Sequence, residues 1–391
     1  MHTLRDLELK GKRVLVRVDF NVPMDDSGAI TDDIRIRTAL PTIRYLLEQE
    51  ARVILCSHMG SPKGKRVDSL SLAPAARHLA GLLGRSIAMA PDCVGPEVEA
   101  LAATLQPGQV LMLENLRFHA GEQANDQAFA RGLTVLADVY VNDAFAAAHR
   151  AHASVVGVPA LCPLKAAGFL LQKELEYFHR AMDEPQRPLV AIVGGAKVSS
   201  KLGALENMLN RVDRLLIGGA MANTFLKSQG LSVGASKVEE DLLETAARLL
   251  NQARRQAVKV YLPVDVVAAD TFSATAVTKL VTTQDIPENW MALDIGPATV
   301  QYFREAMADA RTIVWNGPVG AFEMAPFARG TMALAQALAA SHALTITGGG
   351  DSNAAVKLSG ESESISYMST GGGAFLMLME GKALPGVSAL E

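Results

Sequence analysis

The chain has 391 residues, of which 49% are hydrophobic and 20% are charged. This composition excludes an intrinsically disordered chain and provides enough apolar residues for two cores of ordinary size. A formal net charge of −4 argues against a nucleic-acid partner, because such binding depends on many basic contacts, but it leaves room for a local basic pocket.

The cysteines and the N-terminal residues indicate the cellular compartment of the protein. The three cysteines, Cys56, Cys93 and Cys162, are odd in number and widely spaced, which fits free thiols in a reducing compartment better than a disulfide framework. No apolar stretch of about eighteen residues is present, and the first residues lack the apolar run typical of a signal peptide. We therefore expect a cytoplasmic protein without a membrane partner.

Short apolar runs alternate with longer amphipathic segments along the chain, which is the pattern of repeated βαβ units. In chain order, strands are predicted at residues 13–18, 52–56, 110–113, 139–141, 189–193, 214–217, 258–262, 312–315 and 344–347. Amphipathic segments such as Glu239 to Arg255 place their apolar side chains on one helical face. This number of strands fits two doubly wound parallel sheets in an α/β protein better than one sheet.

Polar and glycine-rich sequences follow the predicted strands at regular intervals. The strands run into D-F-N, S-H-M-G-S, E-N-L-R, N-D-A-F, G-G-A-K, G-G-A, N-G-P and G-G-G-D. Turn formation alone would explain the glycines, but not the repeated arrival of Arg, Lys, Asp and Asn. Because ligands bind outside the carboxyl ends of the strands in doubly wound sheets, these sequences predict binding sites.

The first half of the chain contains a predicted anion pocket. In the string V-L-V-R-V-D-F-N-V-P, strand alternation would project Arg17, Asp19 and Asn21 together at the end of the first strand. Four basic or ring-nitrogen side chains lie at or near predicted strand ends: Arg35, His58, Arg117 and Arg150. The prediction of an anion pocket depends on these four together rather than on any one of them. Arginine suits phosphate and carboxylate because its planar fork donates two parallel hydrogen bonds.

The second half contains a predicted nucleotide site. A strand runs through Gly194-Gly195-Ala196-Lys197 into an expected helix, so that Lys197 and Lys201 would share one helical face and reach the same phosphates. Further along, Asn316 and Glu323 are candidates for contacts with a ribose. Asp351 follows a triglycine, where a carboxylate beside backbone amides suits Mg²⁺. A second triglycine, at residues 371–373, fits a phosphate contact and a tight turn about equally well.

A polar, proline-bearing link at residues 183–188 follows a helical stretch, and we place the boundary between the two halves within residues 166–188. In order and spacing, the motifs of both halves resemble those of the phosphoglycerate kinase family along essentially the whole chain. The resemblance implies reversible Mg²⁺-dependent phosphoryl transfer between 1,3-bisphosphoglycerate and ADP, which gives 3-phosphoglycerate and ATP.

The resemblance also implies the architecture. It implies a monomer of two Rossmann-like domains joined by a helical hinge, whose closure permits direct in-line transfer. Residues 1–170 would bind 3-phosphoglycerate and residues 171–375 the nucleotide, while a tail of about 376–391 would pack back on the first domain.

By the same resemblance, each candidate residue has an implied role. Asp19 and Asn21 would bind the hydroxyl and carboxylate region of 3-phosphoglycerate, and the arginines would hold its phosphate. The residues implied for this substrate are Asp19, Asn21, Arg35, His58, Met59, Gly60, Ser61, Arg117 and Arg150. The catalytic residues would be Arg35, Lys197 and Lys201. The residues implied for the nucleotide are Gly195, Lys197, Lys201, Asn316, Glu323, Gly349, Gly350, Asp351 and Ser352, with Asp351 as the metal ligand.

The sequence departs from the family pattern in the substrate half. The usual H-L-G-R-P reads His58-Met59-Gly60-Ser61-Pro62, so Ser61 replaces an arginine expected to contact phosphate. The nearby basic residues available to compensate are Lys63, Lys65 and Arg66. Ala146 and Ala147 replace a usual Gly and Thr, and we expect an active enzyme with weaker substrate binding. Ser352 replaces a more usual Thr and keeps the hydroxyl.

Two other functions remain open at this point. An NAD-dependent dehydrogenase would also be an α/β protein, but the G-x-G-x-x-G fingerprint and its later acidic residue are missing. A non-catalytic binding protein could have kept the fold and lost the activity, as Ser61 and the two alanines allow. Against it stand the five functional residues retained together: Arg35, Lys197, Lys201, Glu323 and Asp351.

Overall fold

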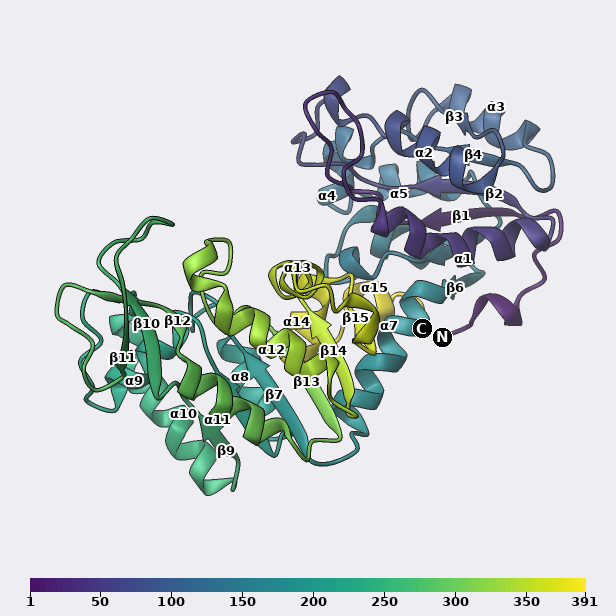
Figure 1. Cartoon of the computed structure of the whole chain (residues 1–391). Coiled ribbons are helices and arrows are strands. Elements are labelled where there is room, and N and C mark those ends of the chain that lie inside the picture. The colour runs from purple at the N-terminus through teal and green to yellow at the C-terminus, as the bar shows by residue number, and fades with distance from the viewer. The chain divides into compact units, whose positions relative to one another are not determined.

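The computed structural model describes residues 1–391, and the chain separates into two compact units. Unit 1 comprises Met1–Leu175 and Ala383–Glu391, and unit 2 comprises Glu176–Lys382 (Figure 1). Each unit contains a six-stranded parallel sheet flanked by helices. The predicted α/β class with two doubly wound parallel sheets is therefore confirmed.

The sheet of unit 1 has the strand order β3-β4-β2-β1-β5-β6. Its strands are β1 (Arg13–Arg17), β2 (Arg52–Cys56), β3 (Ala88–Met89), β4 (Val110–Met112), β5 (Val139–Asn142) and β6 (Lys165–Ala167). The central strands β1, β2 and β5 are buried along almost their whole length, because helices cover both faces of a parallel sheet. The edge strands β3 and β6, of two and three residues, are too short to give a sequence pattern and were not predicted.

Eight α-helices accompany this sheet or leave it. They are α1 (Ile34–Glu48), α2 (Ala73–Leu83), α3 (Pro96–Thr104), α4 (Ala120–Gln123), α5 (Gln127–Thr134), α6 (Val158–Leu161), α7 (Phe169–Phe178) and α15 (Pro385–Ser388). Short 3-10 helices are η1 (Leu4–Asp6), η2 (Asp68–Leu70), η3 (Leu116–Phe118) and η4 (Phe145–Ala147), and η5 (Ala153–Gly157) is a π-helix.

Both ends of the chain lie against β6 in unit 1. The backbone N–H of Ala167 donates to His2 O at 3.1 Å, and Lys165 Nζ donates to Ala389 O at 2.8 Å. Gly386 N, in α15, donates to Ala148 O at 2.8 Å, so the last residues pack beside η4 and η5.

Helix α7 carries the chain across the boundary between the units, which lies between Leu175 and Glu176. Its first turn is held by Asp143, whose Oδ1 accepts from the N–H groups of Leu170 at 2.9 Å and Leu171 at 3.3 Å. A carboxylate at a helix N-terminus complements the positive end of the helix dipole. The π-helix η6 (His179–Asp183) then continues from α7.

The main sheet of unit 2 has the strand order β15-β14-β13-β7-β8-β9. Its strands are β7 (Leu189–Val193), β8 (Arg214–Ile217), β9 (Lys259–Tyr261), β13 (Thr312–Asn316), β14 (Leu344–Gly348) and β15 (Tyr367–Met368). The helices of this unit are α8 (Leu202–Met208), α9 (Met221–Ser228), α10 (Leu243–Arg255), α11 (Pro297–Met307), α12 (Arg329–Ala339), α13 (Gly350–Leu358) and α14 (Gly372–Met379). Its 3-10 helices are η7 (Glu240–Leu242), η8 (Ala325–Phe327) and η9 (Ser362–Ser364).

Unit 2 also contains a three-stranded antiparallel sheet that was not predicted. Its order is β11-β10-β12, from β10 (Asp265–Ala269), β11 (Thr278–Thr282) and β12 (Met291–Ile295). In β10 and β12, buried residues alternate with partly exposed ones over much of their length, and β11 is mostly exposed. These strands therefore lack the continuous apolar runs that mark the buried parallel strands.

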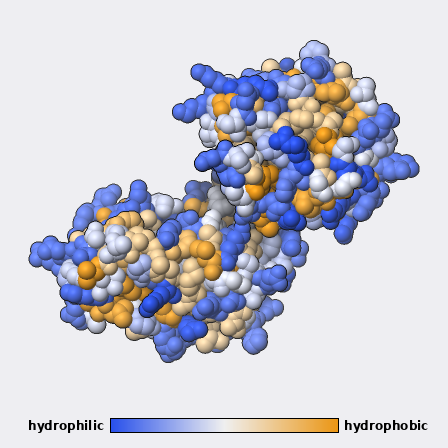
Figure 2. Space-filling view, turned by 45° about the horizontal axis from the view of Figure 1, so that its top comes forward, coloured by the Kyte–Doolittle hydropathy of each residue, from blue (hydrophilic) through white to orange (hydrophobic).

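On the face shown in Figure 2, hydrophilic and hydrophobic residues are interspersed over the surface of each unit. The most exposed large apolar side chains of unit 2 include Phe272, Val277 and Leu280, in and beside β11. None of the helices is both long enough and apolar enough to cross a membrane.

Candidate active site

The candidate site in unit 1 begins with Arg17, Asp19 and Asn21. The alternation of side chains along a strand does not bring these three residues together. Strand β1 ends at Arg17, so Asp19 and Asn21 lie in the loop that follows. The Arg17 side chain is buried, with Nε donating to Ser154 Oγ at 2.9 Å and Nη2 lying 3.0 Å from His58 Nδ1. All three residues contact the 58–60 loop: Arg17 and Asp19 lie beside His58, and Asn21 bonds to Gly60.

Asp19 lies between two of the predicted basic residues. Its Oδ2 accepts a hydrogen bond from Arg35 Nη1 at 2.7 Å, and its Oδ1 lies 3.8 Å from His58 Nδ1. Asp19 is buried and Arg35 is about one-third exposed. The carboxylate therefore fixes the guanidinium of Arg35, at the start of α1, beside the end of β1.

The loop His58-Met59-Gly60 is fixed by hydrogen bonds from three directions. Asn21 Oδ1 accepts from Gly60 N at 2.9 Å, and Arg117 Nη1 donates to Gly60 O at 2.7 Å. Asn115 closes the loop, since its Oδ1 accepts from Met59 N at 3.2 Å and its Nδ2 donates to Met59 O at 2.8 Å. This network holds the substrate loop and Arg117 in one arrangement.

The basic residues lie close enough to perturb one another. Burial lowers the pKa of His58 well below its usual value, and Arg17, Arg117, Arg150 and Arg35 lower it further. A neutral His58 in this field is consistent with a strongly electropositive pocket, because a positive surrounding disfavours another positive charge. The structure thus brings together the four predicted groups of the anion pocket.

Two histidines that sequence reasoning missed lie in the same region. Burial lowers the pKa of His152 to about 4, with smaller contributions from Arg117 and Arg150. His149 Nδ1, His152 Nδ1 and Arg117 Nε are buried nitrogens without a hydrogen-bond partner in the protein. Because buried polar atoms are normally paired, these nitrogens indicate a place for a ligand. The sequence signal that could have revealed these two histidines is the H-R-A-H string around Arg150.

The departures from the family pattern lie at the edge of this pocket. Ser61 is exposed, as are Lys63 and Lys65. Arg66 is engaged elsewhere, since it donates to Pro91 O at 3.0 Å and to Asp68 Oδ1 at 3.3 Å. The structure therefore does not bring the guanidinium of Arg66 into the group formed by Arg35, Arg117 and Arg150. Ala146 and Ala147 lie in η4, half-buried and buried respectively.

In unit 2, a pair of glycines follows β7, as predicted. A Cβ at Gly194 would lie 2.1 Å from Pro318 O, so only glycine permits this approach of two backbones. Gly195 has φ +115°, and its N–H donates to Pro318 O at 2.8 Å.

The expectation that Lys197 and Lys201 share one helical face is wrong. Helix α8 begins only at Leu202, and residues 194–201 form an irregular loop. Ser199 N donates to Glu239 Oε2 at 3.1 Å, and Ser200 Oγ donates back to Lys197 O at 2.9 Å. The Glu239 carboxylate takes the backbone N–H of Ser199, and the Ser200 hydroxyl bonds to a nearby carbonyl, so these residues form a loop instead of a helical turn. Lys197 is left exposed.

Lys201 is instead directed toward the end of β13. Its Nζ donates to Asn316 O at 2.8 Å and to Asn316 Oδ1 at 2.5 Å. Burial lowers the pKa of Lys201 to about 8, with partial compensation from the negative charge of Asp351. Asn316 Nδ2 donates to Gly348 O at 2.7 Å. Asn316, which was expected to face the ribose, thus uses both ends of its amide within the protein.

The first triglycine connects β14 to α13. Gly349 has φ +98° and precedes α13, so Gly350 and Asp351 lie in the first turn of that helix, both exposed. Ser352 is buried, and its Oγ accepts from Gly317 N at 2.6 Å. The second triglycine lies beside the first, because a Cβ at Gly372 would be 3.5 Å from Gly349 Cα. Backbone amides at a helix N-terminus favour a bound anion.

Glu323 is exposed in the loop between β13 and α12. The loop leads into α12, whose first turn is held by Asp294, a residue that sequence reasoning missed. Its Oδ2 accepts from Gly330 N at 2.8 Å, and its Oδ1 accepts from the neighbouring Ile295 N at 2.9 Å. A Cβ at Gly320 would lie 2.1 Å from Asp294 Oδ1. Burial raises the pKa of Asp294 to about 7, against the opposing effect of these hydrogen bonds.

The chain is similar to known proteins over its whole length. The family profile described as phosphoglycerate kinase matches residues 4–382. A phosphoglycerate kinase of Desulfotalea psychrophila is 68% identical over 391 residues, which is 100% of both chains. One of Desulforapulum autotrophicum is 57% identical, also over 100% of both chains.

Solved structures agree with the sequence comparisons. The phosphoglycerate kinase structure from Coxiella burnetii has a TM-score of 0.90 at 45% identity, covering 100% of this chain and 98% of that one. The corresponding structure from Pyrococcus horikoshii has a TM-score of 0.86 at 34% identity, with the same coverage. This chain therefore belongs to the phosphoglycerate kinase family, the glycolytic kinases that exchange a phosphoryl group between 1,3-bisphosphoglycerate and ADP.

Proposed function

We propose that unit 1 binds 3-phosphoglycerate, that unit 2 binds ATP or ADP, and that the phosphoryl group passes directly between them. The observation that carries this proposal is that Arg35, Arg117 and Arg150 lie close enough to His58 to act on its charge. In the same region, three buried nitrogens have no hydrogen-bond partner in the protein: Arg117 Nε, His149 Nδ1 and His152 Nδ1. Such a pocket suits a small substrate with two anionic ends.

On the substrate side, Arg117 and Arg150 hold the phosphate of 3-phosphoglycerate, and Asp19 and Asn21 bind its hydroxyl and carboxylate region. The hydrogen bonds that fix the 58–60 loop support this assignment, because they preorganise the backbone beside Arg117. Met59, Gly60 and Ser61 complete the loop. Arg35, fixed by Asp19, lies nearest to the transferring group and stabilises its charge.

On the nucleotide side, Lys201 binds the phosphates and Lys197 accompanies the transferred group. The exposure of Lys197 supports a role that begins only when both substrates are bound. The backbone at Gly195, Gly349 and Gly350 approaches the phosphates, and Glu323 binds the ribose. Asn316 and Ser352 act by positioning Lys201 and the backbone at Gly317.

Magnesium is the metal that this site fits. Asp351 offers an exposed carboxylate in the first turn of α13, and Mg²⁺ is typically held by one or two carboxylates together with substrate phosphates and water. The bound ion would neutralise phosphate charge and orient the phosphate chain. The residues of this chain hold the ion through Asp351 and the phosphates through Lys201 and backbone amides.

In the transfer step, a carboxylate oxygen of 3-phosphoglycerate attacks the γ-phosphorus of ATP. The new O–P bond gives the acyl phosphate as the bond to ADP breaks, and the reverse reaction makes ATP. Phosphoryl transfer needs in-line positioning and charge neutralisation rather than an enzyme nucleophile. We infer that the two units close about the α7 connector only when both substrates are bound, which excludes water from the reaction.

We also infer that the chain works as a monomer in the cytoplasm. Its place in glycolysis and its three free cysteines fit a reducing compartment.

Trapping of the acyl phosphate tests the proposed reaction. Purified protein is incubated with ATP, Mg²⁺ and 3-phosphoglycerate in the presence of hydroxylamine, which converts the acyl phosphate to a hydroxamate. We expect hydroxamate and ADP in equal amounts, and only when all three components are present. Absence of product, together with normal nucleotide binding, would favour a binding protein that has lost its activity.

A further inference from the structure

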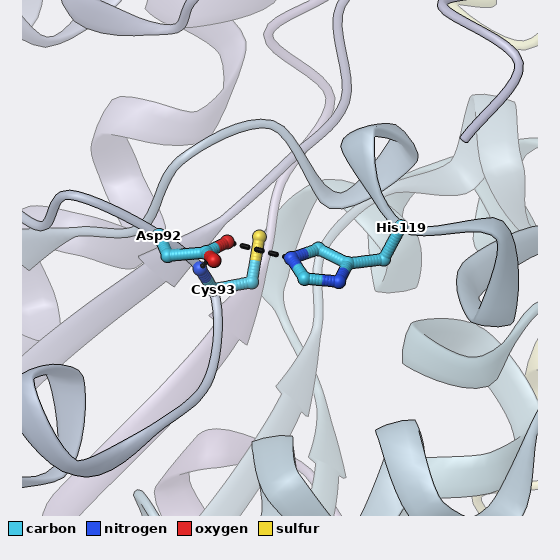
Figure 3. Close-up of side chains that lie close together, drawn as sticks. All are labelled: Asp92, Cys93 and His119. Carbon is cyan, nitrogen blue, oxygen red and sulfur yellow. Dashed lines mark hydrogen bonds and ion pairs between the residues drawn. The ribbon is translucent and has the colours of Figure 1, made fainter. Parts of the chain in front are cut away.

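A cysteine, a histidine and an aspartate that have no role in the proposed reaction come together in unit 1. Asp92 and Cys93 lie in the loop after β3, and His119 follows η3 (Figure 3). One ligand atom from each side chain lies within 4.8 Å of the other two. His119 Nε2 is 2.6 Å from Asp92 Oδ1, and the sulfur of Cys93 lies beside this pair.

This cluster does not have the geometry of an activated nucleophile. The thiol of Cys93 donates to Glu114 O at 2.9 Å rather than to His119, and the residue is buried. Burial raises the pKa of the Cys93 thiol well above its usual value. A nucleophilic cysteine needs a lowered pKa and access to a substrate, and Cys93 has neither.

We propose that Asp92, Cys93 and His119 form a binding site for Zn²⁺ or a similar borderline-soft divalent cation. Sulfur, imidazole nitrogen and carboxylate oxygen are all zinc ligands, and three protein ligands leave a fourth position for water. Asp92 and a deprotonated Cys93 supply two negative charges, which match the charge of the ion. The oxygen-only preference of Mg²⁺ separates this site from the proposed one at Asp351.

The surroundings allow the ligands to rearrange about an ion. Ligand bonds of about 2.0–2.3 Å place the donor atoms of a tetrahedral site roughly 3.3–3.8 Å apart. The 2.6 Å contact between His119 Nε2 and Asp92 Oδ1 must therefore open, and no pair of ligand atoms starts more than 4.8 Å apart. The side chains of Asp92 and His119 are 47% and 30% exposed, so they can turn and an ion can reach them. The His119 ring is stacked on Phe129, with centroids 4.9 Å apart, which limits the ring to few orientations.

Binding exchanges one set of bonds for another. The S–H bond of Cys93 breaks and its proton passes to buffer, while the sulfur gives up its hydrogen bond to Glu114 O and binds the ion. The proton that His119 Nε2 shares with Asp92 is released to solvent and the ring proton is carried on Nδ1, so that the Nε2 lone pair binds the ion. Asp92 replaces its bond to His119 with a bond to the ion.

Cobalt provides the probe for the test, because a thiolate bound to Co²⁺ absorbs in the near ultraviolet. The full-length protein, without nucleotide, is titrated with CoCl2 and then with ZnCl2. We expect one equivalent of Co²⁺ to give the thiolate band, one equivalent of Zn²⁺ to remove it, and Zn²⁺ to raise the melting temperature. His119→Gln should weaken Zn²⁺ binding at least tenfold, and Cys93→Ser should abolish the band.

Two matched variants control for non-specific effects. His78→Gln removes a histidine that is paired with Asp33 at 2.7 Å without a neighbouring thiol, and Cys162→Ser removes another buried cysteine. Both should bind Co²⁺ as the unaltered protein does. The proposal is overturned if the unaltered protein gives no thiolate band. It is also overturned if Cys93→Ser and His119→Gln, folded by circular dichroism, bind Zn²⁺ as tightly as the two controls.

Discussion

Lys201 lies in the loop before α8, and its ammonium group contacts both oxygen atoms of Asn316, the last residue of β13. The distances from Nζ are 2.8 Å to the backbone oxygen and 2.5 Å to Oδ1. The other end of the same amide donates to Gly348 O, in the first residue of the first triglycine. Asn316 therefore links the proposed phosphate-binding lysine to the loop that carries Asp351.

Replacement of Asn316 tests this link. In Asn316→Ala, Lys201 loses one acceptor and Gly348 O loses its donor, so we expect the Kd for ADP to rise roughly tenfold. The KM for 3-phosphoglycerate should change less than twofold, because no residue of unit 1 is altered. Calorimetry and steady-state kinetics measure the two effects. Asn207→Ala, which removes a bond to Met379 O in the same unit, is the control, and an equal loss of ADP affinity in that variant would exclude a specific link.

The lowered pKa of Lys201, at about 8, makes nucleotide binding depend on pH. The phosphates of ADP favour the charged lysine, so binding raises this pKa and takes up protons near pH 8.5. We expect the affinity for ADP to fall as the pH rises above 8. Calorimetry in two buffers of different ionisation enthalpy measures the proton uptake. Lys201→Arg keeps its charge in this range and should show no uptake; uptake in that variant would assign the proton to another group.

The sequence predicted the parallel sheets and the anion pocket because both leave strong local patterns. Strands β2, β7 and β8 agree with the predicted ranges to the residue, since each is an apolar run that ends at a serine or a glycine. The basic residues of the pocket follow strand ends, and the topology of a parallel sheet brings such ends together.

Features that depend on tertiary contacts were missed. The start of α8 is set by the contact of Ser199 with Glu239, forty residues away, so the G-G-A-K pattern alone suggested a helix too early. His149 and His152 became site candidates only because their buried Nδ1 atoms have no hydrogen-bond partner in the protein. Asp294 holds the first turn of α12, after the loop that carries Glu323, by accepting from a backbone N–H group, which no side-chain motif reveals.

Ser61 is the position where the substrate pocket departs from the family pattern. It is exposed beside the loop that Arg117 fixes, and no nearby guanidinium replaces the missing one. We expect Ser61→Arg to lower the KM for 3-phosphoglycerate several-fold, through an added charge-assisted hydrogen bond, with the KM for ATP unchanged. Ser69→Arg adds the same charge at another exposed position. No change in KM for Ser61→Arg, or the same change in both variants, would show that residue 61 does not contact the substrate.

Arg35 is expected to act in the transfer step rather than in nucleotide binding. Arg35→Ala removes the guanidinium held by Asp19, and we expect turnover to fall by about 10³-fold or more while the Kd for ADP stays within twofold. Arg37→Ala alters the same helix at an exposed ion pair with Asp33 and should remain active. A nucleotide-binding defect as large as the loss of turnover would contradict the proposed division of roles between the units.

Asp143 makes the stability of unit 1 depend on pH. Burial raises the pKa of Asp143 to about 7, although its hydrogen bonds oppose this effect. Because the unfolded pKa is near 3.8, the unfolded chain loses this proton first as the pH rises. The stabilising contribution of Asp143 to the free energy of unfolding is therefore complete below about pH 4, falls between pH 4 and 7, and is lost above pH 7.

Asp143→Asn removes this ionisation and keeps Oδ1 as the acceptor for the first turn of α7. We expect the variant to resist urea better than the unaltered protein at pH 8, with little difference at pH 4.5. Both tryptophans, Trp290 and Trp315, lie in unit 2, so their fluorescence follows unit 2, whereas circular dichroism reports both units. The higher urea concentration needed to unfold the variant should appear in the circular dichroism and be absent from the tryptophan fluorescence. If the difference between the two proteins is the same at pH 4.5 and pH 8, Asp143 is not the group that titrates.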